Sequence, residues 1–338
     1  MPNFCVPLLL SLMAANVRAM PGRGNGLTVA AVPLRHLSNT LNKAVHEPDW
    51  RRQWGLRGKF WRGLGRLGLT GIHSAPIHRN WLDVRRLSMP FDDLPANLVG
   101  KRIVQISDLH VSPVVWKGYM REQLRHVADL RPDLLVVTGD LVTGGYRYAS
   151  FAAELLAELN PRPPLGVVCT LGNHDYSMHG KRSPIEAQRR ADHFAKVLRG
   201  QGLTLLLNES LDLGGLTLVG LDDLWTGRLD ADAAFGDVAG PAICLNHDPR
   251  NAGQLLDHPW QWMLSGHTHG RQLATSTVGR TFNKKRRREF VRGLYELPGG
   301  RKLYVNRGLS YGQRWEPWCK PEITVFKLRR ALANDGGE

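Results

Sequence analysis

The chain has 338 residues, of which 42% are hydrophobic, and this composition excludes general disorder while allowing one large α/β domain with an appendage or two modest domains. The formal charge is +15, and residues 1–100 contribute more than half of it, with 13 basic against 5 acidic side chains (13 − 5 = +8). Such an excess favours an anionic partner, either a phosphate-rich polymer or an acidic membrane face, although a basic proteome or a solubility device would also account for it.

The first residues contain one short apolar stretch, Phe4–Ala15. Because no run of 18 apolar residues exists in the sequence, we expect no membrane-spanning helix. No basic residue precedes the stretch, so it makes a poor secretory signal, although Val17-Arg18-Ala19 resembles a weak cleavage site. We interpret residues 1–100 as a basic N-terminal extension that begins with a signal, an anchor or a misassigned start, and we do not expect export.

The segment Trp50–Leu69 has the pattern of a helix that lies on a membrane surface. At 100° per residue, one side of a helical wheel collects apolar side chains and the other collects cations. The apolar side holds Leu56, Phe60, Trp61, Leu64 and Leu67, and the cationic side holds Arg51, Arg52, Lys59, Arg62 and Arg66, with Arg57 as an exception. Five glycines weaken this helix by roughly 1 kcal/mol each relative to alanine. The segment therefore either docks on anionic lipid or packs on its own domain.

From residue 101 onward, β-branched apolar runs alternate with helical patterns. The expected strands are 103–106, 134–138, 167–171, 216–221, 242–245, 262–264, 303–306 and 323–328. The expected helices are 119–130, 150–159 and 183–199, and the last opens with a cap residue, a first-turn proline and a third-position acid at Ser183, Pro184 and Glu186. Strands that alternate with helices are typical of an α/β domain with buried sheets.

The four cysteines, Cys5, Cys169, Cys244 and Cys319, are far apart and form no CxxC pair, which excludes a disulfide framework and a zinc knuckle. Cys169 and Cys244 lie within apolar runs, where a thiol is usually a small core residue. This pattern fits a reducing, cytoplasmic setting best.

Polar clusters follow five of the expected strands. They are Ser107-Asp108-Leu109-His110, Gly139-Asp140, Gly172-Asn173-His174-Asp175, Asn246-His247-Asp248 and Ser265-Gly266-His267-Thr268-His269. Ligands of open α/β sheets bind beyond the carboxyl ends of the strands, so we expect these clusters to converge on one crevice. Carboxylate, amide and imidazole ligands without cysteine suit two divalent ions, and they favour Mn, Fe or Zn over a closed structural zinc site. Each motif alone is weak, since a lone Asp or His is commonly structural, but their joint order is specific.

The series DLH, GD, GNHD, NHD and GHTH resembles the calcineurin-like metallophosphoesterase superfamily over roughly residues 101–328. The resemblance implies a four-layer α-β-β-α sandwich, with residues 101–330 as the catalytic domain and 331–338 as a flexible tail. It also implies one metal site formed by Asp108, His110 and His269, a second formed by Asn173, His247 and His267, and Asp140 as the bridge between the two ions. In the same family His174 would stand beside the leaving group, and Asp175 would orient it.

Further segments, LDVRRLSMP before ISDLH, GLDDL, LYVNRGLSYG and KPEITVFKL, resemble the YkuE/YaeI-like branch of this superfamily. Members of that branch are often attached to membranes, and one group cleaves UDP-2,3-diacylglucosamine, a lipid A precursor, at its pyrophosphate. The chain departs from the family pattern GHTHGGQ at Arg271, which would either clamp a phosphate or be a surface substitution.

Other basic residues near the end of the chain are candidates for anion contacts. Arg307 and Arg314 are candidates for phosphate contacts, like Arg271. The run of five cations at 284–288 would attract a polyanion or an anionic membrane, or would form a solvated turn.

The resemblance implies a two-metal phosphoesterase in which a hydroxide held between the ions attacks phosphorus in line while His174 protonates the leaving oxygen. We expect a peripheral protein of the cytoplasmic membrane face that hydrolyses a phosphodiester or pyrophosphate bond, with UDP-2,3-diacylglucosamine as the leading substrate. One alternative is a nuclease or nucleotide phosphodiesterase, for which the basic surface would bind nucleic acid, although no nucleic-acid module is recognisable. Another is a non-catalytic scaffold of the same fold, which would have no need to retain His174.

Overall fold

The computed structural model describes residues 82–112, 115, 117–143, 148–177, 183–270, 290–310 and 319–331. Several predictions made from the sequence lie outside these residues. They are the surface helix at 50–69, the basic run at 284–288, the phosphate contacts of Arg271 and Arg314, and all but the first residue of the tail at 331–338.

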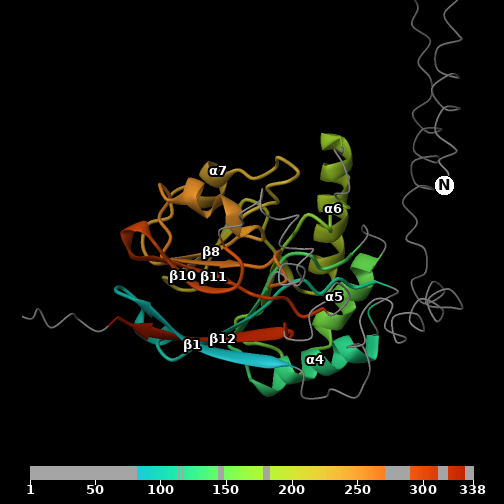
Figure 1. The fold of residues 1–338 in the computed structure, drawn as a ribbon, viewed down its shortest axis with the longest axis horizontal. Helices are drawn as coiled ribbons and strands as arrows, with labels where there is room; N and C mark the ends of the chain where they lie inside the picture. The colour runs from blue at the N-terminus through green and yellow to red at the C-terminus, as the bar shows by residue number, and fades with distance from the viewer. Residues whose placement is uncertain are drawn as a thin grey trace, which may run out of the picture. The chain divides into compact units, whose positions relative to one another are not determined.

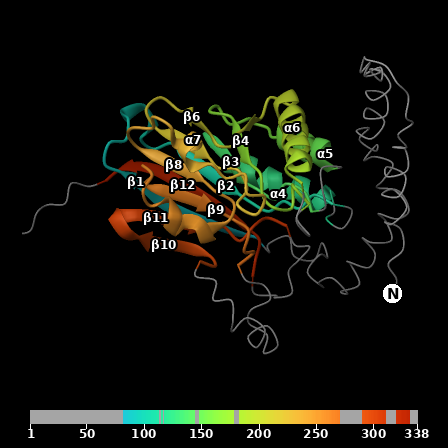
Figure 2. The ribbon, with the colours of Figure 1, turned by 90° about the horizontal axis from the view of Figure 1, so that it is seen from above.

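Two six-stranded sheets form the centre of the fold (Figures 1 and 2). The first sheet has the order β1 (Asp83–Phe91), β12 (Glu322–Arg330), β2 (Arg102–Ile106), β3 (Leu134–Thr138), β4 (Val167–Thr170) and β5 (Thr204–Leu205). The second has the order β10 (Gly293–Leu297), β11 (Arg301–Val305), β9 (Trp262–Ser265), β8 (Ala242–Leu245), β7 (Thr217–Gly220) and β6 (Glu209–Asp212).

The helices lie on the outer faces of these sheets. They are α4 (Lys117–Asp129), α5 (Ala149–Ala157), α6 (Pro184–Gly200) and α7 (Ala231–Phe235), with short 3-10 turns η3 (Ala96–Leu98), η5 (Pro249–Leu255) and η6 (Pro298–Gly300). Helix α6 begins as its sequence predicts, because the side chain of Ser183 accepts a hydrogen bond from the main-chain N–H of Glu186 and Pro184 occupies the first turn.

Among the described helices, none has the length and apolarity needed to cross a bilayer.

Three hydrophobic cores separate four layers, because side chains alternate between the two faces of each strand. In β2, Ile103 faces the second sheet, whereas Val104 faces helices α4, α5 and α6. A third core lies between the other face of the second sheet and α7 with η5, and Figure 1 shows α7 on that outer face. The layers are therefore helix, sheet, sheet and helix, which confirms the predicted α-β-β-α sandwich.

Parallel pairing brings the ends of the central strands together. Strands β2, β3 and β4 are parallel neighbours in the first sheet, and β7, β8 and β9 are parallel neighbours in the second. Their carboxyl ends therefore meet at one edge of each sheet, and the polar clusters start at these ends.

The predicted strands and helices are all present, but the sequence missed β1, β5, β6, β10 and α7. Strand β1 matters most, because it pairs in parallel with β12 along its whole length. Residues 83–98 therefore belong to the folded domain, and the boundary predicted at residue 101 falls too late in the chain. The arginines of β1 are exposed, which is why this strand resembled the basic segment before it.

Candidate metal centre

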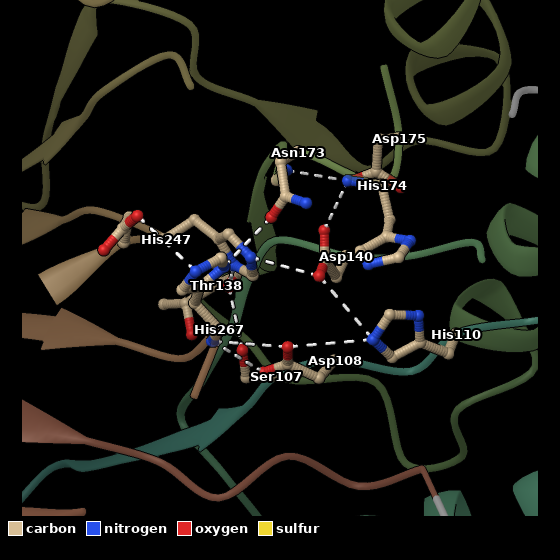
Figure 3. Close-up of polar contacts among 12 residues, drawn as sticks. Ser107, Asp108, His110, Thr138, Asp140, Asn173, His174, Asp175, His247 and His267 are labelled. Atoms are coloured by element: carbon tan, nitrogen blue, oxygen red, sulfur yellow. Dashed lines mark hydrogen bonds and ion pairs between the residues drawn. The ribbon is translucent and has the colours of Figure 1, made fainter. Parts of the chain in front are cut away.

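The loops that follow five strands bring seven polar side chains to one place. Figure 3 labels all of them except His269. They are Asp108 and His110 after β2, Asp140 after β3, Asn173 after β4, His247 after β8, and His267 and His269 after β9. Five of the seven are buried, and only His267 and His269 keep partial exposure. The structure thus brings together every residue that the sequence predicted as a metal ligand.

The backbone at this centre is strained. Eight described residues other than glycine have a positive φ, and five of them are predicted ligands: Asp108 at 52°, His110 at 47°, Asp140 at 53°, His267 at 70° and His269 at 48°. Such a conformation costs of order 1–3 kcal/mol for a side chain that is not glycine, and it persists where the surrounding structure enforces it. The concentration of strain at these five positions indicates a functional site.

Two glycines let the loops approach one another closely. A Cβ atom at Gly266 would lie 1.9 Å from Oγ of Ser107 and 2.4 Å from Oδ2 of Asp108. A Cβ atom at Gly172 would lie 2.4 Å from Oδ1 of Asp140. Any side chain at either position would displace the carboxylates. This steric limit explains why glycine occupies these positions of the GNHD and GHTH motifs.

The first group of ligand atoms belongs to Asp108, His110, Asp140 and His269, all within 4.8 Å of one another. The Nε2 atoms of His110 and His269 lie 3.0 Å apart, and Nε2 of His269 lies 3.3 Å from Oδ1 of Asp108. Burial lowers the pKa of His110 to about 3, so this ring is neutral and offers a lone pair. Carboxylates with neutral imidazoles form a suitable set for a divalent ion.

The second group consists of Asp140, His247 and His267, with Asn173 beside it. Nε2 of His247 lies 3.2 Å from Oδ2 of Asp140, and Nδ1 of His267 lies 3.0 Å from Oδ1 of Asn173. Nδ1 of His247 donates to the Thr138 carbonyl at 2.8 Å, which fixes the ring and directs Nε2 toward the centre. Asp140 belongs to both groups, as expected for a carboxylate that bridges two ions.

Asp140 and Asp108 differ in the direction of their pKa shifts, although both are fully buried. Burial raises the pKa of Asp108 to about 6, with Asp140 adding to the rise. Burial also opposes ionisation of Asp140, but His247, together with His110 and His174, holds the pKa of Asp140 well below its usual range. Asp140 in turn raises the pKa of His247 well above its ordinary value against the effect of burial. In the absence of metal, His247 therefore retains a proton at a position where a metal cation would bind.

His174 lies beside this centre, but Asp175 does not orient it. Nδ1 of His174 donates to the carbonyl of Thr143 at 2.9 Å. The two carboxylate oxygens of Asp175 instead accept hydrogen bonds from the main-chain N–H groups of Gly172 and Val142, each at 2.9 Å. Asp175 therefore organises the loops that carry the candidate ligands. The predicted contact between Asp175 and His174 is wrong, and the residue that orients His174 is Thr143.

Arg307 has partners that the sequence did not suggest. Its Nε donates to Glu322 and its Nη2 donates to Asp83, so the guanidinium joins β12 to β1. The side chain is only 11% exposed. These contacts favour a structural ion pair over a phosphate contact, which stays a prediction.

Two contacts with the site were not predicted. Asp248 is buried, and its Oδ2 lies 3.5 Å from Nε2 of His267. Its position directly after His247 in the NHD motif was the signal for it. The Thr143 carbonyl that holds His174 has no such signal, because every residue carries a backbone carbonyl.

Comparison with known proteins gives consistent matches. The family model described as calcineurin-like phosphoesterase matches residues 101–271. The UDP-2,3-diacylglucosamine pyrophosphatase LpxG of Chlamydia trachomatis is 31% identical over 311 residues, and the match covers 77% of this chain and 93% of LpxG. The uncharacterised metallophosphoesterase YkuE of Bacillus subtilis is 30% identical, covering 70% of this chain and 82% of YkuE. The phosphodiesterase YaeI of Escherichia coli is 29% identical, with coverage of 73% and 88%.

Proposed function

The chain belongs to the calcineurin-like phosphoesterase family and is a metal-dependent phosphoric ester hydrolase, and from this premise we propose that it cleaves the pyrophosphate bond of a lipid-linked nucleotide such as UDP-2,3-diacylglucosamine. The name of the LpxG relative supports this substrate class, since it matches this chain over 93% of its own length. The observation that carries the proposal is the position of Asp140 in both groups of ligand atoms. A site that holds two ions on one carboxylate suits phosphoryl transfer.

The seven ligand residues divide into two metal positions in this proposal. Asp108, His110 and His269 hold the first ion, Asn173, His247 and His267 hold the second, and Asp140 serves both. The oxygen and nitrogen donors favour Mn, Fe or Zn. When bound, two such ions activate water and neutralise the charge that develops on the phosphoryl oxygens.

His174 serves the leaving group. Its main-chain N–H donates to Oδ1 of Asp140 at 2.9 Å, which keeps the residue beside the shared carboxylate. Because the Thr143 carbonyl can only accept, Nδ1 keeps its proton and Nε2 is the atom that delivers a proton to the departing oxygen. Proton transfer of this kind contributes roughly 10²–10⁴ in rate. In the balanced reaction, the water oxygen joins one phosphorus, the P–O bond to the bridging oxygen breaks, and UMP and a lipid phosphate are released.

Two rival functions make different predictions. A nuclease or nucleotide phosphodiesterase would use the basic residues for nucleic acid, but no known nucleic-acid module is recognisable in the sequence. A scaffold without activity would have no reason to keep His174 held beside Asp140. We therefore favour an enzyme with a small lipid-linked substrate.

A membrane-resident substrate requires that the enzyme reach the bilayer. We assign this task to the segment Trp50–Leu69, and we place the enzyme on the cytoplasmic face, which agrees with cysteines that form no CxxC pair. The five cations at 284–288 would add to attraction by anionic lipid.

A substrate panel tests the proposal. The purified enzyme with Mn²⁺ is given UDP-2,3-diacylglucosamine, bis(p-nitrophenyl) phosphate, and single- and double-stranded DNA, with Asp140→Asn as the inactive control. We expect the highest kcat/KM for the pyrophosphate-linked lipid. Faster cleavage of DNA would favour the nuclease, and no turnover of any substrate by the metal-loaded protein would favour the scaffold.

A further inference from the structure

Trp225 is an exposed aromatic residue beside the metal centre. It lies in the turn after β7 and is 44% exposed. The centroid of its ring lies 6.1 Å from that of the ligand His267, with the ring planes at 43°. A large apolar side chain left exposed next to a catalytic centre is a candidate wall for the part of the substrate that does not react.

The turn that carries Trp225 is held by several hydrogen bonds. The Thr226 N–H donates to Oδ2 of Asp223 at 2.9 Å, and the Thr226 hydroxyl donates to the Asp223 carbonyl at 2.8 Å. The preceding residue, Asp222, accepts from the hydroxyl of Tyr176 at 2.6 Å and from Nε of Arg228 at 2.7 Å. A ligand that contacts this indole therefore loses little affinity to ordering of the turn.

Arg250 and Asp248 complete the surroundings of the indole. Nε1–H of Trp225 donates to Oδ2 of Asp248 at 2.9 Å, and Nε and Nη2 of Arg250 bond the same carboxylate. Cζ of Arg250 lies 4.5 Å from the centre of the Trp225 ring, a cation–π contact. Within the described part of the chain, Nη1 of Arg250 makes no hydrogen bond, and the side chain is 36% exposed.

These groups suit a nucleoside phosphate better than an acyl chain. Any nucleobase can stack on an exposed indole, because stacking requires no particular hydrogen-bond donors or acceptors. A guanidinium nitrogen can donate a hydrogen bond to phosphate. An acyl chain would instead meet the partly exposed guanidinium of Arg250, whose desolvation opposes its binding.

We propose that Trp225 and Arg250 form the nucleoside subsite of the enzyme, in which the base stacks on the indole and Nη1 of Arg250 donates to the phosphate of the nucleotide half. This inference deepens the proposed function and rests on it for the identity of the substrate. Asp248 connects the subsite to the metal centre, since the same carboxylate lies 3.5 Å from Nε2 of His267. The nucleotide half of the substrate is thereby placed beside the second metal position.

Calorimetric titration of the Mn²⁺-loaded full chain tests the subsite with three probes: UMP, uridine and inorganic phosphate. Trp225→Ala should weaken UMP and uridine roughly five- to hundredfold, the loss of one stacked base, and should leave inorganic phosphate unchanged. Trp225→Phe keeps an aromatic face and should lose less. Arg250→Gln should weaken UMP more than uridine, because uridine has no phosphate. Leu294→Ala, another exposed apolar residue on β10, is the matched control.

The outcomes separate the subsite from the proposed function. Equal UMP affinity in the wild type and Trp225→Ala would overturn the subsite, whatever the enzyme hydrolyses. Equal losses for UMP and inorganic phosphate in Trp225→Ala would also overturn it, because they would indicate damage to the metal centre. If Trp225 is required for UMP binding but UDP-2,3-diacylglucosamine is not cleaved, the subsite stands and the lipid substrate is wrong.

Discussion

The main-chain N–H of His174 donates to Oδ1 of Asp140, while Oδ2 of Asp140 faces His110 at 3.6 Å and His247 at 3.2 Å. One oxygen of this carboxylate therefore holds His174, the residue that we propose as the proton donor, and the other lies near both groups of candidate ligand atoms. We therefore propose that the position of His174 and the integrity of the candidate metal centre depend on a single side chain.

Asp140→Asn should nearly abolish turnover and lower metal content, because an amide offers one oxygen where both oxygens are in use. Metal analysis after gel filtration measures the content, and Asp129→Asn, an exposed carboxylate on α4, is the matched control. A variant with two ions per chain and normal turnover would contradict the role of Asp140 as the bridge.

His174→Ala should cut kcat by roughly two to four decades and leave the metal content near that of the wild type. The loss should be smaller for nitrophenolate than for alkoxide leaving groups, since a nitrophenolate needs little protonation. His126→Ala on α4 is the control for removal of an imidazole elsewhere. Equal losses for both leaving groups would remove His174 from the role of proton donor.

Metal affinity should rise with pH. Burial raises the pKa of Asp108 to about 6, and Asp140 raises that of His247 above its ordinary value, so both groups carry protons in the metal-free protein at acidic pH. An ion must displace these protons, and the apparent Kd for Mn²⁺ should therefore increase as the pH falls through about 6. Calorimetry in buffers of different ionisation enthalpy counts the protons released. A Kd that does not change between pH 5.5 and 8 would contradict this assignment.

Arg307→Met should lower the free energy of unfolding by about 3–5 kcal/mol, because it leaves the buried Glu322 without its cation. Denaturant unfolding measures this loss. The control is Arg329→Met, which changes an exposed residue of β12, the strand that carries Glu322. If Arg307 also contacts phosphate, as the sequence suggested, the variant should in addition show a raised KM. Unchanged stability would contradict the structural role of the ion pair.

Replacing Phe60, Trp61 and Leu64 with serine should release the protein from anionic vesicles while hydrolysis of a soluble diester continues. Each cation near such a surface contributes about 1 kcal/mol, and the attraction should weaken with salt because the Debye length falls from about 10 Å at 0.1 M to about 3 Å at 1 M. Flotation with and without anionic lipid measures the binding. Ile185→Ser, which removes an exposed apolar side chain on α6, controls for a general loss of apolar surface. Unchanged flotation of the triple variant would indicate that the segment packs on its own domain and does not bind lipid.

Much of the fold could be predicted because its signals are local. Strand β3 is buried on both faces and reads as an unbroken apolar run, and the start of α6 is encoded by Ser183 and Pro184. The ligands could be located for a related reason, since each polar cluster directly follows such a strand.

The rest depends on partners that are distant in the sequence. Strand β1 is recognised only through its pairing with β12, more than two hundred residues away, and β5 has only two residues. Asp175 was given the wrong partner because proximity to His174 in the sequence suggested a contact, whereas the fold turns its carboxylate toward the N–H groups of Gly172 and Val142.

The pairing of β1 with β12 limits how the chain can be shortened. A version that begins at residue 101, made to remove the basic extension, would lose a nine-residue edge strand and open the hydrogen-bonding groups of β12 to other molecules. It would also remove Asp83, an ion-pair partner of Arg307. The residue after Arg307, Gly308, packs closely against Asp108. A truncated enzyme for crystallisation or for comparing soluble and membrane-bound activity should therefore start no later than Leu82.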